Sequence, residues 1–181
     1  DEAVRSLQDM LGKRSLQGER FLDLGCGSGL FSLAAHRLGA DVVSIDFDVD
    51  SVACTEHLRE RFADSSDRWE VKQGSVLDEA MMQSLDRADV DYSWGVLHHT
   101  GDMDRAITLS AQRTKPGGRY FIAIYNDQGG ASRRWLAIKQ IYNRLPNWLR
   151  PVWVALVAGC YETKFALARL AKLQNPLPFQ D

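Results

Sequence analysis

The segment Asp23-Leu-Gly-Cys-Gly-Ser-Gly29 places three glycines at alternate positions after an acidic residue. It lies between a predicted strand at residues 20–24 and a predicted helix at residues 30–38. Glycine permits a sharp turn and a close approach of the backbone to a ligand, and the start of the following helix offers unpaired N–H groups. The segment therefore predicts a ligand-binding loop. Cys26 is part of that loop. A helix start can lower the pKa of a thiol, but the favoured interpretation is that Cys26 is a small residue that the loop tolerates.

A second acid, Asp46, follows the next predicted strand, at residues 41–45, and stands 23 residues after Asp23. In an open parallel sheet, a carboxylate at this place can accept hydrogen bonds from both hydroxyls of a ribose. Dinucleotide-binding loops have the form G-x-G-x-x-G, but Leu30 stands where the third glycine would be. The spacing is G-x-G-x-G, so a different nucleoside cofactor is favoured.

A second group of side chains that could do chemistry follows a predicted strand at residues 90–94. Trp94, His98 and His99 lie at its carboxyl end, which is next to the ligand crevice in an open α/β sheet. Histidine titrates at about 6.5, which suits proton transfer at neutral pH, so His98 and His99 are candidate catalytic bases. The alternative is that both rings cap a helix or pack on the ligand. The four histidines show no metal-ligand spacing, and no metal is expected.

Strand and helix patterns alternate along the first 125 residues. Strands are predicted at residues 20–24, 41–45, 69–72, 90–94 and 120–125, and helices at 1–17, 30–38, 49–62, 81–85 and 103–114. Such alternation is typical of parallel strands joined by right-handed helical crossovers. We therefore predict an α/β fold with a Rossmann-like, doubly wound sheet of five parallel strands. After residue 125 only helices are predicted, at residues 135–145 and 152–173.

The order of these motifs resembles that of the class I S-adenosylmethionine-dependent methyltransferases, whose first motif has the form D-x-G-x-G-x-G. The resemblance covers about two-thirds of the chain, residues 1–125, and includes the segments 42–46, 73–75, 93–99 and 115–118. Within that superfamily the chain looks most like the small-molecule methylases of quinone biosynthesis. The resemblance implies a cofactor-binding domain at residues 1–125 and S-adenosyl-L-methionine as the cofactor.

The resemblance also assigns roles around the loop. Gly25, Gly27 and Gly29 would line the methionine part of the cofactor, with Cys26 between them, and Asp23 would orient the ammonium group.

At the nucleoside end, Asp46 would bind the ribose and Phe47 would pack on the adenine, unless Phe47 is a core aromatic. Ser75 and Val76 would lie beside the adenine edge. Many relatives have an acidic residue where Ser75 stands, and a hydroxyl accepts hydrogen bonds less strongly than a carboxylate. Trp94 would complete the cofactor-binding set. His99 falls where many relatives have a histidine, so the resemblance favours it over His98 as the catalytic base.

The predicted function is transfer of a methyl group from S-adenosylmethionine to a small-molecule acceptor, by O- or C-methylation. A non-catalytic cofactor-binding or partner module is the alternative from another class. Nucleic-acid methylation is disfavoured, because the segment after the fourth strand reads Ser93-Trp-Gly-Val96 and the body is acidic.

Composition excludes several other classes. The chain has 181 residues, 45% of them hydrophobic and 25% charged, which is neither a disordered nor a membrane composition. The longest uncharged apolar run has nine residues, at 152–160, whereas a membrane-spanning helix needs about 20. Three cysteines without C-x-x-C spacing fit a reducing, cytoplasmic compartment.

Charge separates the two segments. Residues 1–125 carry 14 Lys and Arg against 21 Asp and Glu, whereas residues 126–181 carry 8 against 3. The second segment also contains Trp135, Trp148 and Trp153. Basic residues and tryptophans on amphipathic helices can mark a membrane-surface element; the favoured interpretation is a helical lid over the substrate pocket.

The family's fold normally has seven strands, so the predicted five are incomplete. We expect the fifth strand's outer edge to be unpaired here, with the chain continuing beyond Asp181 through a connector at residues 175–179. The alternatives are an edge covered by the tail helices or by another subunit in an oligomer.

Overall fold

The computed structural model describes residues 2–63 and 68–175. Its contacts divide the chain into two compact units, Asp1–Tyr125 and Asn126–Asp181. The boundary coincides with the one expected, while the roles expected for the two segments stay predictions.

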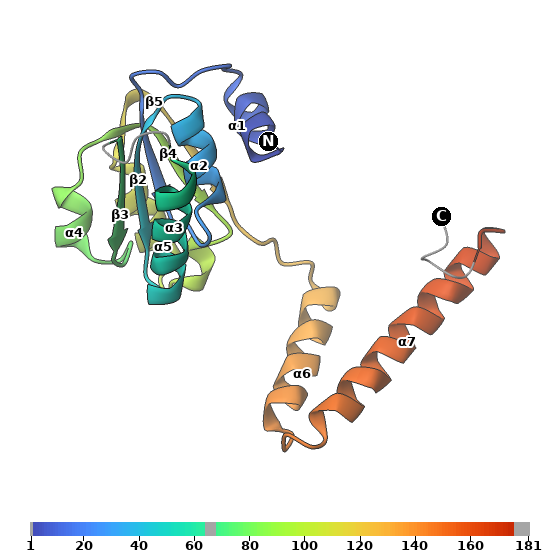
Figure 1. Cartoon of the computed structure of the whole chain (residues 1–181). Coiled ribbons are helices and arrows are strands. Elements are labelled where there is room, and N and C mark those ends of the chain that lie inside the picture. Colours follow the sequence, from blue (N-terminus) through green and yellow to red (C-terminus); the bar gives the residue numbers. More distant parts are fainter. Residues whose placement is uncertain (1, 64–67, 176–181) are drawn as a thin grey trace. The chain divides into compact units, whose positions relative to one another are not determined.

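Unit 1 consists of alternating helices and strands (Figure 1). The strands are β1 (Arg20–Leu24), β2 (Asp41–Asp46), β3 (Trp69–Gln73), β4 (Ala88–Trp94) and β5 (Thr114–Ala123). The helices are α1 (Glu2–Leu11), α2 (Leu30–Arg37), α3 (Val49–Phe62), α4 (Glu79–Ser84), the 3-10 helix η2 (Leu97–His99) and α5 (Met103–Ala111).

The five strands form one parallel sheet in the order β3-β2-β1-β4-β5. The strand order reverses between β1 and β4, and open α/β sheets bind ligands at such a switch point, outside the carboxyl ends of the strands. This arrangement confirms the predicted fold class. In the described residues β5 pairs with β4 alone.

Two hydrophobic clusters cover the two faces of the sheet. The first joins α1 and α2 to side chains such as Phe21, Trp69 and Tyr92. The second joins α4 and α5 to side chains such as Leu22 and Ile45. Because β1 is covered on both faces, four of its five residues are buried, as expected for a central parallel strand.

Aspartates start three of the helices that follow strands. Asp48, Asp78 and Asp102 each accept a hydrogen bond from the backbone N–H three residues later, at 3.0–3.2 Å. Such caps satisfy N–H groups that a helix start leaves unpaired. They fix where α3, α4 and α5 begin and thus shape the loops at the carboxyl edge of the sheet.

The two largest differences from the predicted element boundaries are at the end of α1 and the start of β5. Helix α1 ends at Leu11 instead of residue 17, because Gly12 adopts a positive φ of 60°. Strand β5 begins at Thr114, whereas Pro116 and Gly117 indicated a turn ahead of the strand. An irregularity in the β4–β5 pairing, between Ala88 and Val90, accommodates this segment within the strand.

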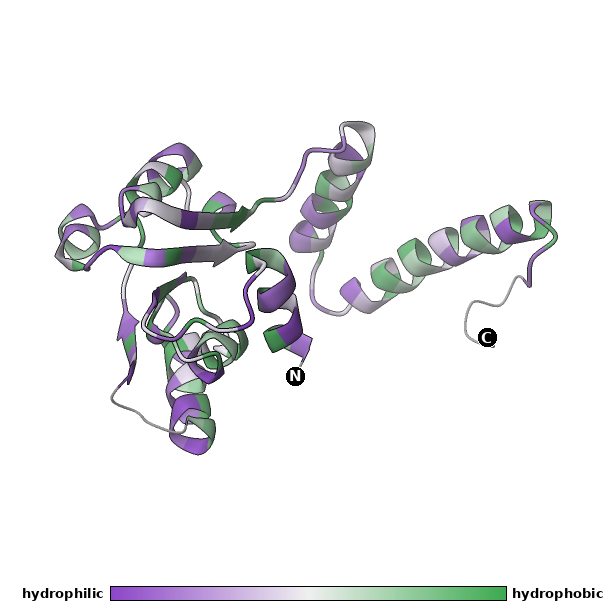
Figure 2. Ribbon diagram, turned by 90° about the horizontal axis from the view of Figure 1, so that it is seen from above, coloured by the Kyte–Doolittle hydropathy of each residue, from purple (hydrophilic) through white to green (hydrophobic). Residues whose placement is uncertain are grey.

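Unit 2 contains two helices, α6 (Gly130–Arg144) and α7 (Arg150–Ala171), as predicted, and no strand in residues 126–175. Neither helix has a buried residue, and Figure 2 shows hydrophobic positions along much of α7. No helix in the described part of the chain is long and apolar enough to cross a membrane. Most of the predicted connector, residues 176–179, lies outside the described residues.

Candidate active site

A cavity of about 340 Å³ lies at the carboxyl edge of the unit 1 sheet. Its volume falls in the range of small-molecule sites. Segments after β1, β2, β3 and β4 supply the walls, which consist of Gly25, Ile45, Asp46, Phe47, Asp48, Gly74, Ser75, Val76, Val96, His99 and Thr100. Six of these residues belong to the set predicted from the sequence: Gly25, Asp46, Phe47, Ser75, Val76 and His99.

The glycine loop folds over the end of β2. The backbone N–H groups of Gly25 and Cys26 both donate to the carbonyl oxygen of Ile45, at 2.7 and 3.1 Å. Gly25 has a φ of 81°, and a Cβ added there would lie 2.4 Å from a methyl carbon of Val96. Gly27 also has a positive φ, with open space where its Cβ would point. The loop therefore leaves its backbone accessible to a ligand, which fits a cofactor cradle.

Asp46 holds this loop in place. One carboxylate oxygen accepts from the N–H of Gly27 at 2.9 Å, and the other accepts from the N–H of Asp48 at 2.9 Å. A carboxylate has about four acceptor positions, so each oxygen keeps capacity for one further donor. Two neighbouring ribose hydroxyls match that remaining capacity.

Asp23 lies behind the loop and does not line the cavity. Its carboxylate is 2% exposed and accepts from the Ser32 hydroxyl at 2.5 Å. Burial raises the pKa of Asp23 to about 7, the Ser32 hydrogen bond opposes the shift, and the charge of Asp46 adds to it. Asp23 is thus a buried acid that titrates near neutrality beside the loop.

Two other loop residues, Cys26 and Gly29, contact α3. The Cys26 sulfur lies 3.4 Å from the Thr55 hydroxyl oxygen, which itself donates to the Gly27 carbonyl at 3.0 Å. Burial raises the pKa of Cys26 to about 12, which favours the interpretation of Cys26 as a small loop residue over that of a reactive thiol. A Cβ on Gly29 would lie 2.8 Å from Thr55. Gly29 therefore allows close packing and does not line the cavity.

The expected adenine-binding residues lie together. Phe47 is 77% exposed and is therefore not a core aromatic. The Ser75 hydroxyl accepts from the N–H of Leu77 at 3.1 Å and keeps its own proton free to donate. Val76 is buried among the residues of the second hydrophobic cluster.

His98 and His99 form an aromatic group with Tyr125. The His98 ring centroid lies 4.0 Å from that of His99 and 4.3 Å from that of Tyr125. Both ring nitrogens of His98 are shielded from solvent, and desolvation, then the charge of His99, lowers its pKa. His99 is exposed and lines the cavity. The geometry therefore favours His99 over His98 as the base.

Trp94 is 56% exposed at the end of β4 and does not line the cavity; its ring stacks on Tyr92, with 6.2 Å between ring centroids.

Sequence reasoning missed six contributors to this site. Five of them line the cavity, namely Ile45, Asp48, Gly74, Val96 and Thr100, and the sixth, Tyr125, contacts both histidines. The position of Tyr125, as the last residue of the predicted fifth strand, was the available signal, because carboxyl ends of parallel strands meet at one edge.

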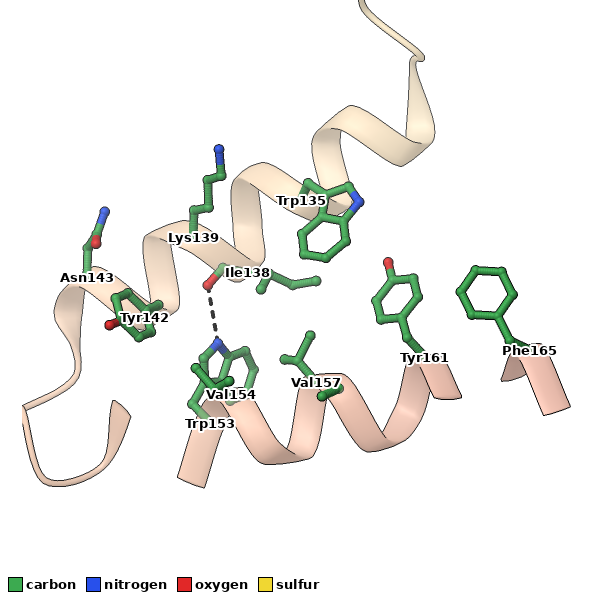
Figure 3. Close-up of a pocket in the computed structure, with 11 residues that line it drawn as sticks. Trp135, Ile138, Lys139, Tyr142, Asn143, Trp153, Val154, Val157, Tyr161 and Phe165 are labelled. Carbon is green, nitrogen blue, oxygen red and sulfur yellow. Dashed lines mark hydrogen bonds between the residues drawn. The ribbon is translucent and has the colours of Figure 1, made fainter. Parts of the chain in front are cut away.

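A second cavity, of about 560 Å³, lies within unit 2 between α6 and α7 (Figure 3). Trp135 stacks on Tyr161 at 5.2 Å, and the Trp153 indole N–H donates to the Ile138 carbonyl at 3.3 Å. Lys139 is its only charged lining residue, and it has no carboxylate or imidazole partner in the lining. Of these two cavities, the one in unit 1 is lined by carboxylates and an imidazole. No group of three metal-ligating side chains is found in the described residues.

Comparison with known proteins supports the class that this fold and site define. Residues 1–175 match a family described as a methyltransferase domain. The chain is 32% identical over 170 residues to a ubiquinone biosynthesis O-methyltransferase of Sinorhizobium medicae (strain WSM419), covering 94% of this chain and 62% of that protein. It is also 32% identical over 119 residues to the protein of that name in Brucella melitensis biotype 2, covering 66% of this chain and 46% of that one.

Solved structures agree with this family. A SAM-dependent methyltransferase from Geobacter sulfurreducens, in complex with S-adenosyl-L-homocysteine, is 29% identical with a TM-score of 0.54. A similar complex from Thiobacillus denitrificans is 27% identical with a TM-score of 0.55. Each match covers 67% of this chain and 47% of the other.

The chain belongs to the methyltransferase-domain family, within the class I S-adenosylmethionine-dependent methyltransferases. It spans 62% of the Sinorhizobium relative and about half of the other proteins named above.

Proposed function

We propose that this protein transfers a methyl group from S-adenosyl-L-methionine to a small-molecule acceptor, at oxygen or carbon. The observation that carries the proposal is the cavity at the carboxyl edge of the sheet, where the glycine loop and Asp46 lie together. Bound S-adenosylhomocysteine in the Geobacter and Thiobacillus relatives supports the cofactor. The names of the Sinorhizobium and Brucella relatives, ubiquinone biosynthesis O-methyltransferases, support an O-methylated, quinone-related acceptor.

When bound, the cofactor supplies an electrophilic methyl group and the leaving group of an in-line displacement. The protein's part is to hold an acceptor in line and exclude water. The loop backbone and Asp46 would fix the cofactor, while Phe47 and Val76 would enclose its adenine. His99 would accept the acceptor's proton, since it faces the cavity with an exposed imidazole.

The α6–α7 hairpin, residues 130–171, would form a lid over the acceptor. Its support is the aromatic cavity in Figure 3, which offers apolar surface to an acceptor. The competing role is contact with an anionic membrane surface through the basic side chains of the hairpin. The protein would lie in the cytoplasm, where it could assemble into an oligomer.

Calorimetry with S-adenosylhomocysteine tests cofactor binding, with NAD as the competing cofactor. We expect binding of the first and none of the second; the reverse would overturn the proposal. Turnover is then followed as S-adenosylhomocysteine released in the presence of phenol, quinol and carboxylate acceptors. Cofactor binding without turnover of any acceptor would leave a non-catalytic cofactor-binding module instead.

A further inference from the structure

A chain of buried hydrogen bonds crosses unit 1 from β3 to Asp23. The Trp69 indole N–H donates to the Ser44 hydroxyl at 2.8 Å, Ser44 donates to the Ser32 hydroxyl at 2.7 Å, and Ser32 donates to the Asp23 carboxylate at 2.5 Å. The four residues come from β3, β2, α2 and β1, and each is at most 2% exposed. Water therefore does not compete for these contacts.

The chemistry of Trp69 sets the direction of this chain. An indole N–H can only donate, so the Ser44 hydroxyl must accept from it and donates its single proton to the Ser32 hydroxyl. The Ser32 hydroxyl in turn donates its single proton to the Asp23 carboxylate. The chain therefore ends on an acceptor, and the ionised carboxylate is the stronger acceptor.

The surroundings of Asp23 oppose ionisation. Burial is the largest effect, and the Asp46 carboxylate raises the Asp23 pKa further. Asp91 and Tyr92 of β4 and Cys26 of the loop also interact electrostatically with Asp23. The hydroxyl and the backbone N–H of Ser32 favour the charged form. The protonated and ionised forms of Asp23 are thus close in free energy near neutral pH, and the hydrogen bonds from Ser32 favour the ionised form.

We propose that Trp69, Ser44 and Ser32 form a positioning relay that keeps Asp23 anionic, ready to attract the cationic ammonium end of the cofactor. The inference rests on the proposed function, because it needs a cationic ligand beside the glycine loop. It assigns a role in cofactor affinity to three residues that do not line the cavity. Trp69, on the edge strand β3, is the most distant of them along the relay.

The test is calorimetric binding of S-adenosylhomocysteine between pH 6 and pH 9. In the unaltered chain we expect affinity to rise with pH through a midpoint near 7. Ser32→Ala should move this midpoint up by about 1 pH unit or more, because a hydrogen bond to a charged group is lost. Affinity at pH 7 should then fall about fivefold or more, since the ionised fraction of Asp23 falls from about one half to about one tenth, and recover toward the wild-type value at pH 9.

Graded variants separate the relay from general damage. The midpoint shift should decrease in the order Ser32→Ala, Ser44→Ala, Trp69→Phe, because each residue is one hydrogen bond further from Asp23. Asp23→Asn should abolish the pH dependence. Ser110→Ala removes another fully buried serine, on α5 at the opposite face of the sheet, and should leave the midpoint unchanged. Circular dichroism checks that each variant is folded.

Two results overturn the relay. One is a wild-type midpoint that the serine variants do not move; the other is an affinity loss that is the same at every pH, as packing damage alone would give. Absence of S-adenosylhomocysteine binding by the unaltered chain at every pH is a different outcome. It would refute the proposed function itself.

Discussion

At the scale of single residues, Asp46 combines two tasks. It accepts hydrogen bonds from two backbone N–H groups that shape the loops, and it keeps acceptor capacity toward the cavity. Asp46→Ala removes both, and hydrogen bonds to a charged group contribute about 1.5–3 kcal/mol each. We expect S-adenosylhomocysteine affinity to fall more than tenfold in calorimetry. Asp41→Ala, at the exposed opposite end of β2, is the matched control. Equal losses in both variants would contradict the assignment to Asp46.

Asp91 gives a prediction about stability and pH. It is fully buried in β4, and its pKa is raised to about 8, first by burial and then by the charge of Asp23. In the unfolded chain an aspartate has a pKa of about 3.9. Between those values the native state holds a proton that the unfolded state has released, so stability falls as pH rises from about 4 to about 8.

Asp91→Asn removes that proton linkage. Urea unfolding at pH 5 to 8 should show a slope of stability against pH that is less negative by up to about 1.4 kcal/mol per pH unit. Asp89→Asn is the contrasting control in the same strand. Burial of Asp89 is outweighed by hydrogen bonds from the Arg20 backbone and Lys115, which lower its pKa. Its contribution is lost only as pH falls below about 5, where the unfolded state begins to bind a proton, so Asp89→Asn should leave the slope between pH 5 and 8 unchanged. An unchanged slope in Asp91→Asn would show that Asp91 is ionised in the native state.

At the scale of elements, the glycine loop and the segment before η2 depend on one another. A Cβ at Gly25 would overlap Val96, and its φ of 81° adds backbone strain. We expect Gly25→Ala to reduce stability by about 1–3 kcal/mol and to weaken S-adenosylhomocysteine binding at least tenfold. Gly12 also has a positive φ, but a Cβ added there would meet open space. Gly12→Ala, the matched control, should reduce stability without affecting binding. Urea unfolding and calorimetry measure both quantities, and unimpaired binding in Gly25→Ala would argue against a close contact there.

The elements also show what the sequence could and could not predict. The number and parallel arrangement of the strands follow from local apolar patterns and turn residues, and the predicted fold class is confirmed. The start of β5 does not, because Pro116 and Gly117 indicate a turn locally, whereas Thr114 already pairs with Ala88 and a register shift joins it to the pairing that resumes at Arg119. Tyr125 was missed for a similar reason. Its contact with His98 depends on the register of two strands that are distant in sequence.

At the scale of the whole molecule, the two units differ in how they hide apolar surface. Both hydrophobic clusters lie in unit 1, whereas α6 and α7 have no buried residue. Large exposed apolar patches mark interaction sites. Since the basic residues of residues 126–181 outnumber the acidic ones by 8 to 3, charge alone permits both a solvated lid and a membrane-facing hairpin. Substitution of aromatic residues at different places on the hairpin can distinguish the lid from the membrane-facing role.

Trp135 stacks on Tyr161 inside the hairpin, whereas Trp148 is 73% exposed at the turn between the helices. If the hairpin is a lid, Trp135→Ala should raise the KM for the acceptor about tenfold, because the aromatic wall is lost, while S-adenosylhomocysteine affinity stays unchanged. Trp148→Ala should then leave both quantities unchanged. If the hairpin instead faces a membrane, Trp148→Ala should weaken co-sedimentation with phosphatidylglycerol vesicles, since an exposed tryptophan anchors at that interface. An unaltered KM in Trp135→Ala would refute the lid.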